Sequence, residues 1–181
     1  MSKEAMPSVI FRTPRFDVCK KIVTARTGTR EFYYIKKPNA VSIAAFEDNR
    51  ILLLKAHRAT TGISAYELPG GRIEPGEAPE DAVIRELYEE AGARIDAPQM
   101  LHVISPLTAT STELIHIFAG RMTGNAKVLD SARAEGIEEL EFFSETEALD
   151  LIYENKIAMS ADVHAIVLAF KWLSSHQGDI G

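Results

Sequence analysis

Residues 70–93, GGRIEPGEAPEDAVIRELYEEAGA, contain six glutamates and one aspartate. A helix is predicted over 79–91, because a proline suits its first turn and a glycine follows its end. Glu86, Glu89 and Glu90 gather at its C-terminal half, where the helix dipole disfavours anions. Like charges four residues apart also destabilise a helix, by roughly 0.2–0.5 kcal/mol. The chain therefore needs a physical reason to keep these carboxylates together.

Two interpretations of the acidic cluster are open. It is either a solvated face, partly neutralised by an Arg85–Glu89 pair, or a site for a hard divalent cation held by carboxylate oxygens. A Gly-Gly pair, a Pro-Gly turn and Glu77 lie just upstream, in a loop that can fold back toward the cluster. The helix should dock through its apolar face, which consists of Val83, Ile84, Leu87, Tyr88 and Ala91.

Length and composition fit one domain with a small appendage. The chain has 181 residues, of which 46% are hydrophobic and 25% charged. A net charge of −6 gives a nucleic acid polymer no broad electrostatic attraction. Cys19 is the sole cysteine, which excludes an internal disulfide and favours a cytoplasmic protein. No apolar run is long enough for a transmembrane helix, so no membrane partner is expected.

Alternating and apolar runs predict strands joined by turns. The expected strands span 15–25, 31–36, a hairpin over 41–58, a short YEL segment, 99–106, 113–121 and 137–143. The hairpin strands are nearly continuous apolar runs, which predicts burial on both faces. Beyond the acidic helix, Ser144 should cap a helix that ends near 155, and Ser160 should cap the last helix. The predicted class is α+β, or a mixed α/β sandwich.

The acidic stretch resembles the Nudix box over its whole span. The matching positions are Gly71, Glu77, Arg85-Glu86-Leu87, Glu89-Glu90 and Gly92, with the spacing of the family pattern. Ala93 departs from it, where the pattern prefers a larger aliphatic residue. The resemblance implies a mixed α/β/α sandwich. It also implies Mg²⁺- or Mn²⁺-dependent hydrolysis of a nucleoside diphosphate linked to another moiety.

The resemblance also implies roles for individual residues. The metal ligands would be the backbone carbonyl of Gly70 with Glu77, Glu86, Glu89 and Glu90. Arg85 would orient the glutamates and, with Glu89, belong to the catalytic group.

Outside the box, an N-terminal β-hairpin is followed by PNAVSIAAFEDNRILLLKAHR at 38–58, YELPGG at 66–71 and STELIHIF at 111–118. This layout resembles the ADP-ribose pyrophosphatase branch, in which an N-terminal hairpin precedes the hydrolase domain. The resemblance implies an N-terminal β-hairpin subdomain over 1–38, which joins two chains into a homodimer, and a hydrolase domain over 39–181. Arg58 would grip the diphosphate, Glu67 would line the substrate pocket, and Glu113 would be the general base.

The expected reaction is the conversion of ADP-ribose to AMP and ribose 5-phosphate. Alternatives are another nucleotide sugar such as GDP-mannose or an ADP-hexose, an oxidised nucleoside triphosphate, or a sensor that binds ADP-ribose without cleaving it. Phe32, Tyr33 and Tyr34 are interpreted as strand and core packing, with stacking on a base as the alternative.

Overall fold

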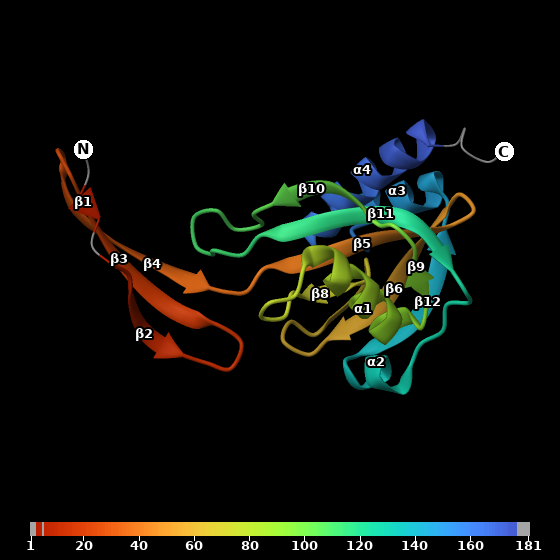
Figure 1. The fold of residues 1–181 in the computed structure, drawn as a ribbon, viewed down its shortest axis with the longest axis horizontal. Coiled ribbons are helices and arrows are strands. Elements are labelled where there is room, and N and C mark those ends of the chain that lie inside the picture. The colour runs from red at the N-terminus through yellow and green to blue at the C-terminus, as the bar shows by residue number, and fades with distance from the viewer. Residues whose placement is uncertain (1–2, 5, 177–181) are drawn as a thin grey trace. The chain divides into compact units, whose positions relative to one another are not determined.

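The computed structural model describes residues 3–4 and 6–176 of the chain (Figure 1). They form two compact units. The first unit consists of Met1–Asn39 and Ser105–Leu114, and the second of Ala40–Ile104 and Ile115–Gly181. The first unit thus includes the loop 105–114. The expected division into 1–38 and 39–181 placed this loop in the hydrolase domain.

The first unit is an antiparallel sheet built around one long strand. Strand β3 (Asp17–Ala25) pairs with β4 (Gly28–Lys36) along one edge, and with β1 (Lys3–Glu4) and β2 (Ser8–Arg12) along the other. The β3–β4 hairpin was predicted, whereas the two short strands were not. The loop 105–114 adds to the free edge of β4, since the N–H of Ile35 donates to the carbonyl of Thr110 at 2.8 Å.

The second unit is built on a mixed sheet with the order β10-β11-β5-β6-β12. Its strands are β5 (Ala40–Glu47), β6 (Arg50–Arg58), β7 (Ile63–Glu67), β8 (Gly70–Arg72), β9 (Arg94–Ile95), β10 (Gln99–Ile104), β11 (Ile115–Thr123) and β12 (Ile137–Phe143). Strand β11 lies parallel to β5, while β8 continues the sheet beside the first half of β5 and β7 beside the second half of β6. Most of β5 and β6 is fully buried, which confirms that these strands are covered on both faces.

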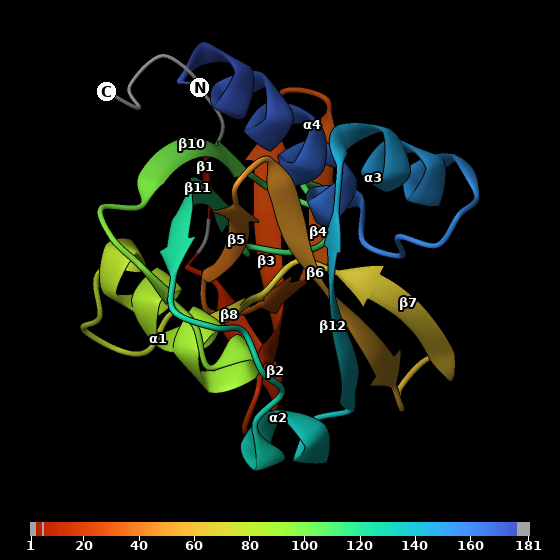
Figure 2. The same ribbon diagram turned by 90° about the vertical axis from the view of Figure 1, so that its right-hand side faces the viewer.

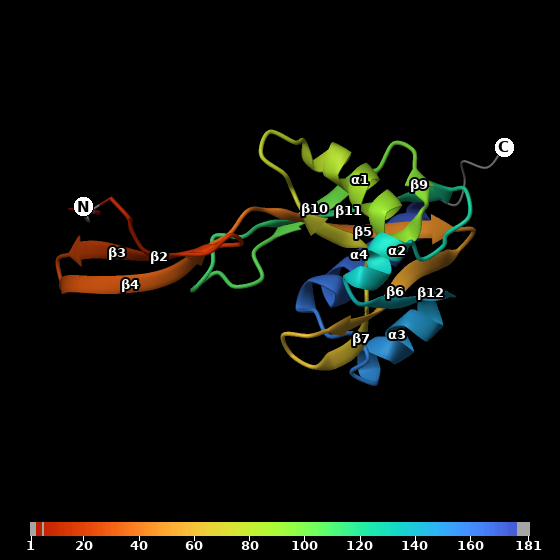
Figure 3. The same cartoon turned by 90° about the horizontal axis from the view of Figure 1, so that it is seen from below.

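Helices cover both faces of this sheet. Helix α1 (Pro79–Ala91) lies on one face, and α3 (Glu145–Tyr153) and α4 (Ser160–Ser175) lie on the other (Figures 2 and 3). Val83 and Leu87 of α1 share a core cluster with Phe118 of β11, whereas Phe46 and Phe170 belong to the cluster beneath α3 and α4. The α+β sandwich is therefore confirmed. No helix in the described part of the chain is long and apolar enough to cross a membrane.

Two helix predictions need correction. Ser144 caps α3 in a complete capping box with Glu147, as predicted. Ser160, however, is the first residue of α4; the cap position is Met159, which offers no side-chain acceptor. The short helix α2 (Asp130–Ala134) was missed, because five residues are too few to show a helical period.

Helix α1 has the predicted bounds but not quite the predicted faces. Gly92 adopts φ 61° and closes the helix, donating its N–H to the carbonyl of Tyr88 at 2.9 Å. Ile84 and Tyr88 are 42% and 50% exposed, so they lie outside the docking face. Glu90, expected on the solvated side, is instead 6% exposed. The buried Glu90 therefore marks the centre of the candidate site.

Candidate active site

Glu90 is a carboxylate enclosed between α1 and the start of β8. Its Oε2 accepts a hydrogen bond from the backbone N–H of Gly70 at 2.8 Å. Burial is the main cause that raises the pKa of Glu90 to about 8, and the charge of Glu86 adds to it. Burial also raises the pKa of Glu86. One end of α1 thus carries two carboxyl groups, Glu86 and Glu90, whose ionised forms are destabilised by burial.

Gly71 lies directly against the Glu86 carboxylate. A Cβ atom at this position would come within 2.5 Å of the carboxyl carbon and both oxygens of Glu86. At Gly70, a Cβ would meet the carbonyl oxygen of Val41 at 2.3 Å. The Gly-Gly pair therefore allows β8 to approach α1 on one side and β5 on the other.

Arg85 connects the glutamates of the loop to those of the helix. Its Nε and Nη2 donate to the two oxygens of Glu77 at 2.8 and 2.9 Å, and its Nη1 donates to Glu86 at 2.7 Å and Glu89 at 3.1 Å. These bonds raise the pKa of Arg85, and the bonds from Arg85 are the main cause that lowers the pKa of Glu77 to about 2. The loop does fold back as predicted, so Arg85 neutralises more of the cluster than one Arg85–Glu89 pair would.

Arg58 and Glu67 form a second ion pair on neighbouring strands. Nε of Arg58 donates to both oxygens of Glu67, at 3.1 and 3.0 Å, and its Nη2 donates to Oε2. Glu67 is 5% exposed, whereas the Arg58 side chain is 39% exposed. The bonds to Glu67 are the main cause that raises the pKa of Arg58, and the charge of Glu90 contributes. The structure thus brings these two predicted residues together, with Arg58 within electrostatic reach of Glu90.

The available donors suit a hard cation better than a soft one. The candidate ligand atoms are carboxylate oxygens of Glu86 and Glu90 and the backbone carbonyl of Gly70, which is an all-oxygen set of the kind that Mg²⁺ and Mn²⁺ prefer. Among the residues described, no three acidic, histidine or cysteine side chains form a metal cage. Mg²⁺ is commonly bound through only one or two carboxylates, with water and substrate phosphates completing its shell. Glu77 and Glu89 both accept hydrogen bonds from Arg85.

Glu113 belongs to the first unit. Its carboxylate pairs with Lys37 at 2.7 Å, and its side chain is 13% exposed.

A different acidic residue, Glu135, was missed by the sequence interpretation. Its negative charge contributes to the raised pKa values of Glu86, Glu90 and Arg58, so it lies within electrostatic reach of the candidate site. Its place just after the short, unpredicted helix α2 left no pattern that could have identified it.

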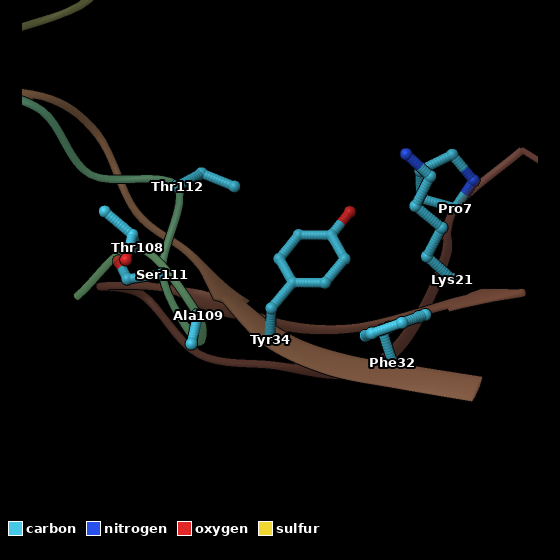
Figure 4. Close-up of a pocket in the computed structure, with 8 residues that line it drawn as sticks. All are labelled: Pro7, Lys21, Phe32, Tyr34, Thr108, Ala109, Ser111 and Thr112. Atoms are coloured by element: carbon cyan, nitrogen blue, oxygen red, sulfur yellow. The ribbon is translucent and has the colours of Figure 1, made fainter. Parts of the chain in front are cut away.

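The first unit contains a hollow of about 310 Å³. Figure 4 shows the Tyr34 ring between Phe32 and Lys21 on one side and the loop residues Thr108 and Ser111 on the other. Phe32 is 48% exposed and Tyr33 is 54% exposed, so these two rings do not pack into a core as interpreted from the sequence.

The comparison with family models agrees with this geometry. The NUDIX domain model matches residues 36–163, which include α1, the Gly-Gly pair and both ion-pair groups. The chain belongs to the Nudix family.

Known relatives and a solved structure point the same way. A methanol dehydrogenase activator of Bacillus methanolicus is 29% identical over 152 residues, covering 81% of this chain and 78% of that protein. An ADP-ribose pyrophosphatase of Bacillus subtilis (strain 168) is 28% identical over 137 residues, covering 73% and 72%. The crystal structure of an ADP compounds hydrolase matches with a TM-score of 0.82 at 21% identity, over 99% of this chain and 97% of that one, which supports the fold. The Nudix member described here is thus a pyrophosphohydrolase enzyme.

Replacing Glu90 should change how stability depends on pH. Since the folded pKa of Glu90 is raised from 4.5 to about 8, the unfolded chain ionises first, and stability falls as pH rises through that window. Glu90→Gln keeps an acceptor for the N–H of Gly70 and removes the titration. Without divalent metal at pH 8.5, we expect the variant to be more stable than the wild type by at least ~1 kcal/mol, with the two converging near pH 4.

Urea unfolding at several pH values measures this difference. Exposed Glu80, at the other end of α1, provides the matched control, and Glu80→Gln should not reproduce the gain. A Glu90→Gln variant less stable than the wild type at pH 8.5 would contradict the account of a destabilised buried anion.

Proposed function

We propose that this Nudix enzyme hydrolyses ADP-ribose to AMP and ribose 5-phosphate, with Mg²⁺ or Mn²⁺ as cofactor. The observation that carries the proposal is the placement of a paired arginine, Arg58, within electrostatic reach of the buried carboxylate Glu90. The guanidinium can bind a phosphate oxygen directly. The carboxylate can hold a cation that binds the same diphosphate. The similarity to an ADP-ribose pyrophosphatase supports the choice of nucleotide.

The residues of the site have distinct proposed tasks. Glu86, Glu90 and the Gly70 carbonyl hold the cation, which offsets the charge of the diphosphate oxygens when bound. Arg85 fixes the directions of Glu77, Glu86 and Glu89 through the ion pairs described above.

Arg58 would contact the diphosphate directly. Two of its nitrogens donate to Glu67, and a guanidinium has five N–H donors in all, so others can face a phosphate oxygen. Glu67 would hold the guanidinium plane in one orientation and form a wall of the substrate pocket.

Two carboxylates are candidates for the group that takes the proton of the attacking water. Glu113 is the residue implied by the family resemblance, and it forms an ion pair with Lys37. Glu135 is favoured by electrostatics, because its charge acts on Glu86 and Glu90.

We also propose that the enzyme is a homodimer, joined through the N-terminal subdomain over 1–38. The exposure of Val9, Ile10 and Phe11 along β2, at 41%, 52% and 62%, supports an apolar surface that a second chain would cover. Light scattering that reports 20.0 kDa, the mass of one chain, would contradict this proposal. The cytoplasmic location remains an expectation from the lone cysteine.

The alternatives differ in the moiety attached to the nucleotide or in whether it is cut. GDP-mannose and an ADP-hexose would use the same diphosphate contacts, so only a substrate panel separates them from ADP-ribose. A non-cleaving sensor is disfavoured because every glutamate of the box is present, and the first unit disfavours an oxidised triphosphate as substrate.

The decisive assay is a panel of nucleotide substrates with and without Mg²⁺. We expect ADP-ribose to give AMP and ribose 5-phosphate, with the highest kcat/KM of the panel and no turnover in the presence of EDTA. A higher kcat/KM for GDP-mannose or an ADP-hexose would reassign the substrate. Tight ADP-ribose binding without any AMP would instead identify a sensor.

Replacing each candidate base separately should identify the proton acceptor. We expect Glu135→Gln to lower kcat by roughly 10²–10⁴-fold, with KM and Mn²⁺ affinity little changed. Glu113→Gln should lower kcat less. The opposite order would assign the role to Glu113, and two unimpaired variants would place the base elsewhere in the molecule.

A further inference from the structure

The segment Glu67–Gly70 joins β7 to β8, and buried groups hold its backbone from several sides. The N–H of Gly70 donates to Oε2 of Glu90 at 2.8 Å, and the N–H of Leu68 donates to Oδ2 of Asp162 at 3.2 Å. Pro69 has no N–H, and its carbonyl accepts from the N–H of Ile43 at 2.9 Å. Both N–H groups between Glu67 and Gly71 therefore depend on a buried carboxyl group.

Asp162 is one of these two carboxyl groups, and it comes from a distant part of the chain. It lies in the first turn of α4 and is 2% exposed. Its Oδ1 accepts from Oγ of Ser42 on β5 at 3.2 Å, while its other oxygen faces Leu68. The two oxygens thus fasten the segment to the central strand and to the helix that covers it.

A purely structural role explains this carboxyl group poorly. Burying a carboxyl group is unfavourable, and a neutral acceptor could satisfy the N–H of Leu68 at less cost. Asp162 also shares its surroundings with the buried Glu67, and burial followed by the charge of Glu67 raises its pKa to about 7. A first-turn aspartate does stabilise a helix through the dipole, but a solvent-exposed one would do so equally well.

The neighbours of Leu68 indicate what the carboxyl group does. Immediately before Leu68 stands Glu67, which orients Arg58, and two residues after it stands Gly70, whose carbonyl is a proposed metal ligand. A shift of the Leu68 peptide would therefore move the anion-binding and the cation-binding parts of the site together. Groups that orient ligands in this way affect metal affinity and activity by roughly 10–100-fold when removed.

We propose that Asp162 is a positioning residue that sets the placement of Glu67 and of the Gly70 carbonyl by holding the N–H of Leu68. This inference rests on the proposed metal-dependent hydrolysis. The group acts through its hydrogen bonds rather than its charge. An asparagine can therefore replace it, because its carbonyl oxygen accepts from Leu68 and its amide donates to the Ser42 hydroxyl.

Three variants test the proposal. Asp162→Leu has nearly the same shape and no acceptor, Asp162→Asn keeps the acceptor, and Glu147→Leu, which also removes an acceptor, is the matched control. Glu147 completes the capping box of α3 and has no bond to the segment, so its loss weakens a helix start without touching Leu68.

Two readouts besides turnover apply to each variant. Mn²⁺ affinity is measured by electron paramagnetic resonance in the absence of substrate, and exchange of the Leu68 amide is measured by NMR. We expect Asp162→Leu to bind Mn²⁺ roughly 10–100-fold more weakly and to exchange the Leu68 amide faster. Its kcat for ADP-ribose should fall as well. Asp162→Asn and Glu147→Leu should stay within about threefold of the wild type in Mn²⁺ affinity, well below that loss.

The outcomes separate this inference from the proposed function. A wild type that binds no Mn²⁺ would overturn the metal-dependent function itself. A wild type that binds Mn²⁺, together with an Asp162→Leu variant that binds it equally well, would overturn only the role of Asp162. Equal weakening in Asp162→Leu and Glu147→Leu would assign Asp162 to general helix stability. If Asp162→Leu does not fold, the Asp162→Asn variant decides, because a tenfold loss of Mn²⁺ affinity there would contradict the hydrogen-bond role.

Discussion

The burial of two neighbouring carboxylates at the end of α1 is the constraint on which the site depends. Burial is the main cause that raises the pKa of both Glu86 and Glu90. The charge of Glu89 raises the pKa of Glu86 further, and the charge of Glu86 raises that of Glu90. Arg85 offsets part of the repulsion by binding Glu77, Glu86 and Glu89 at once. Glu90 is left with only a backbone N–H as its partner among the hydrogen bonds described. A bound cation would favour the ionised form of both carboxylates.

Strand β8 and the loop before α1 place backbone and side-chain groups close to these carboxylates. Gly70 and Gly71 let β8 run close beneath the helix, because any side chain there would collide with Val41 or Glu86. The same closeness presents the N–H of Gly70 to Glu90 and turns Glu77 toward Arg85. Binding a diphosphate would then require only that Arg58, already oriented by Glu67, face the same space. The close approach of β8 to α1 and the ion pairs of Arg58 and Arg85 thus orient the side chains of the site.

Much of this could be predicted from the sequence, and the rest could not for identifiable reasons. The spacing of the acidic stretch fixed the bounds of α1, and the apolar runs of β5 and β6 predicted their burial. A helical wheel places Glu90 on the solvated side, because it takes no account of a strand that passes beneath the helix end. Asp162 resembles an ordinary dipole-favoured residue, and its partner Leu68 lies 94 positions away. Burial of polar groups by distant segments is not encoded in any local pattern.

The most direct test is anomalous diffraction from crystals grown with Mn²⁺ near pH 8. The account predicts a manganese peak in contact with a carboxylate oxygen of Glu86, one of Glu90 and the carbonyl oxygen of Gly70, with the Gly70 N–H released from Glu90. A peak bound elsewhere, with Glu90 still accepting from Gly70, would contradict it.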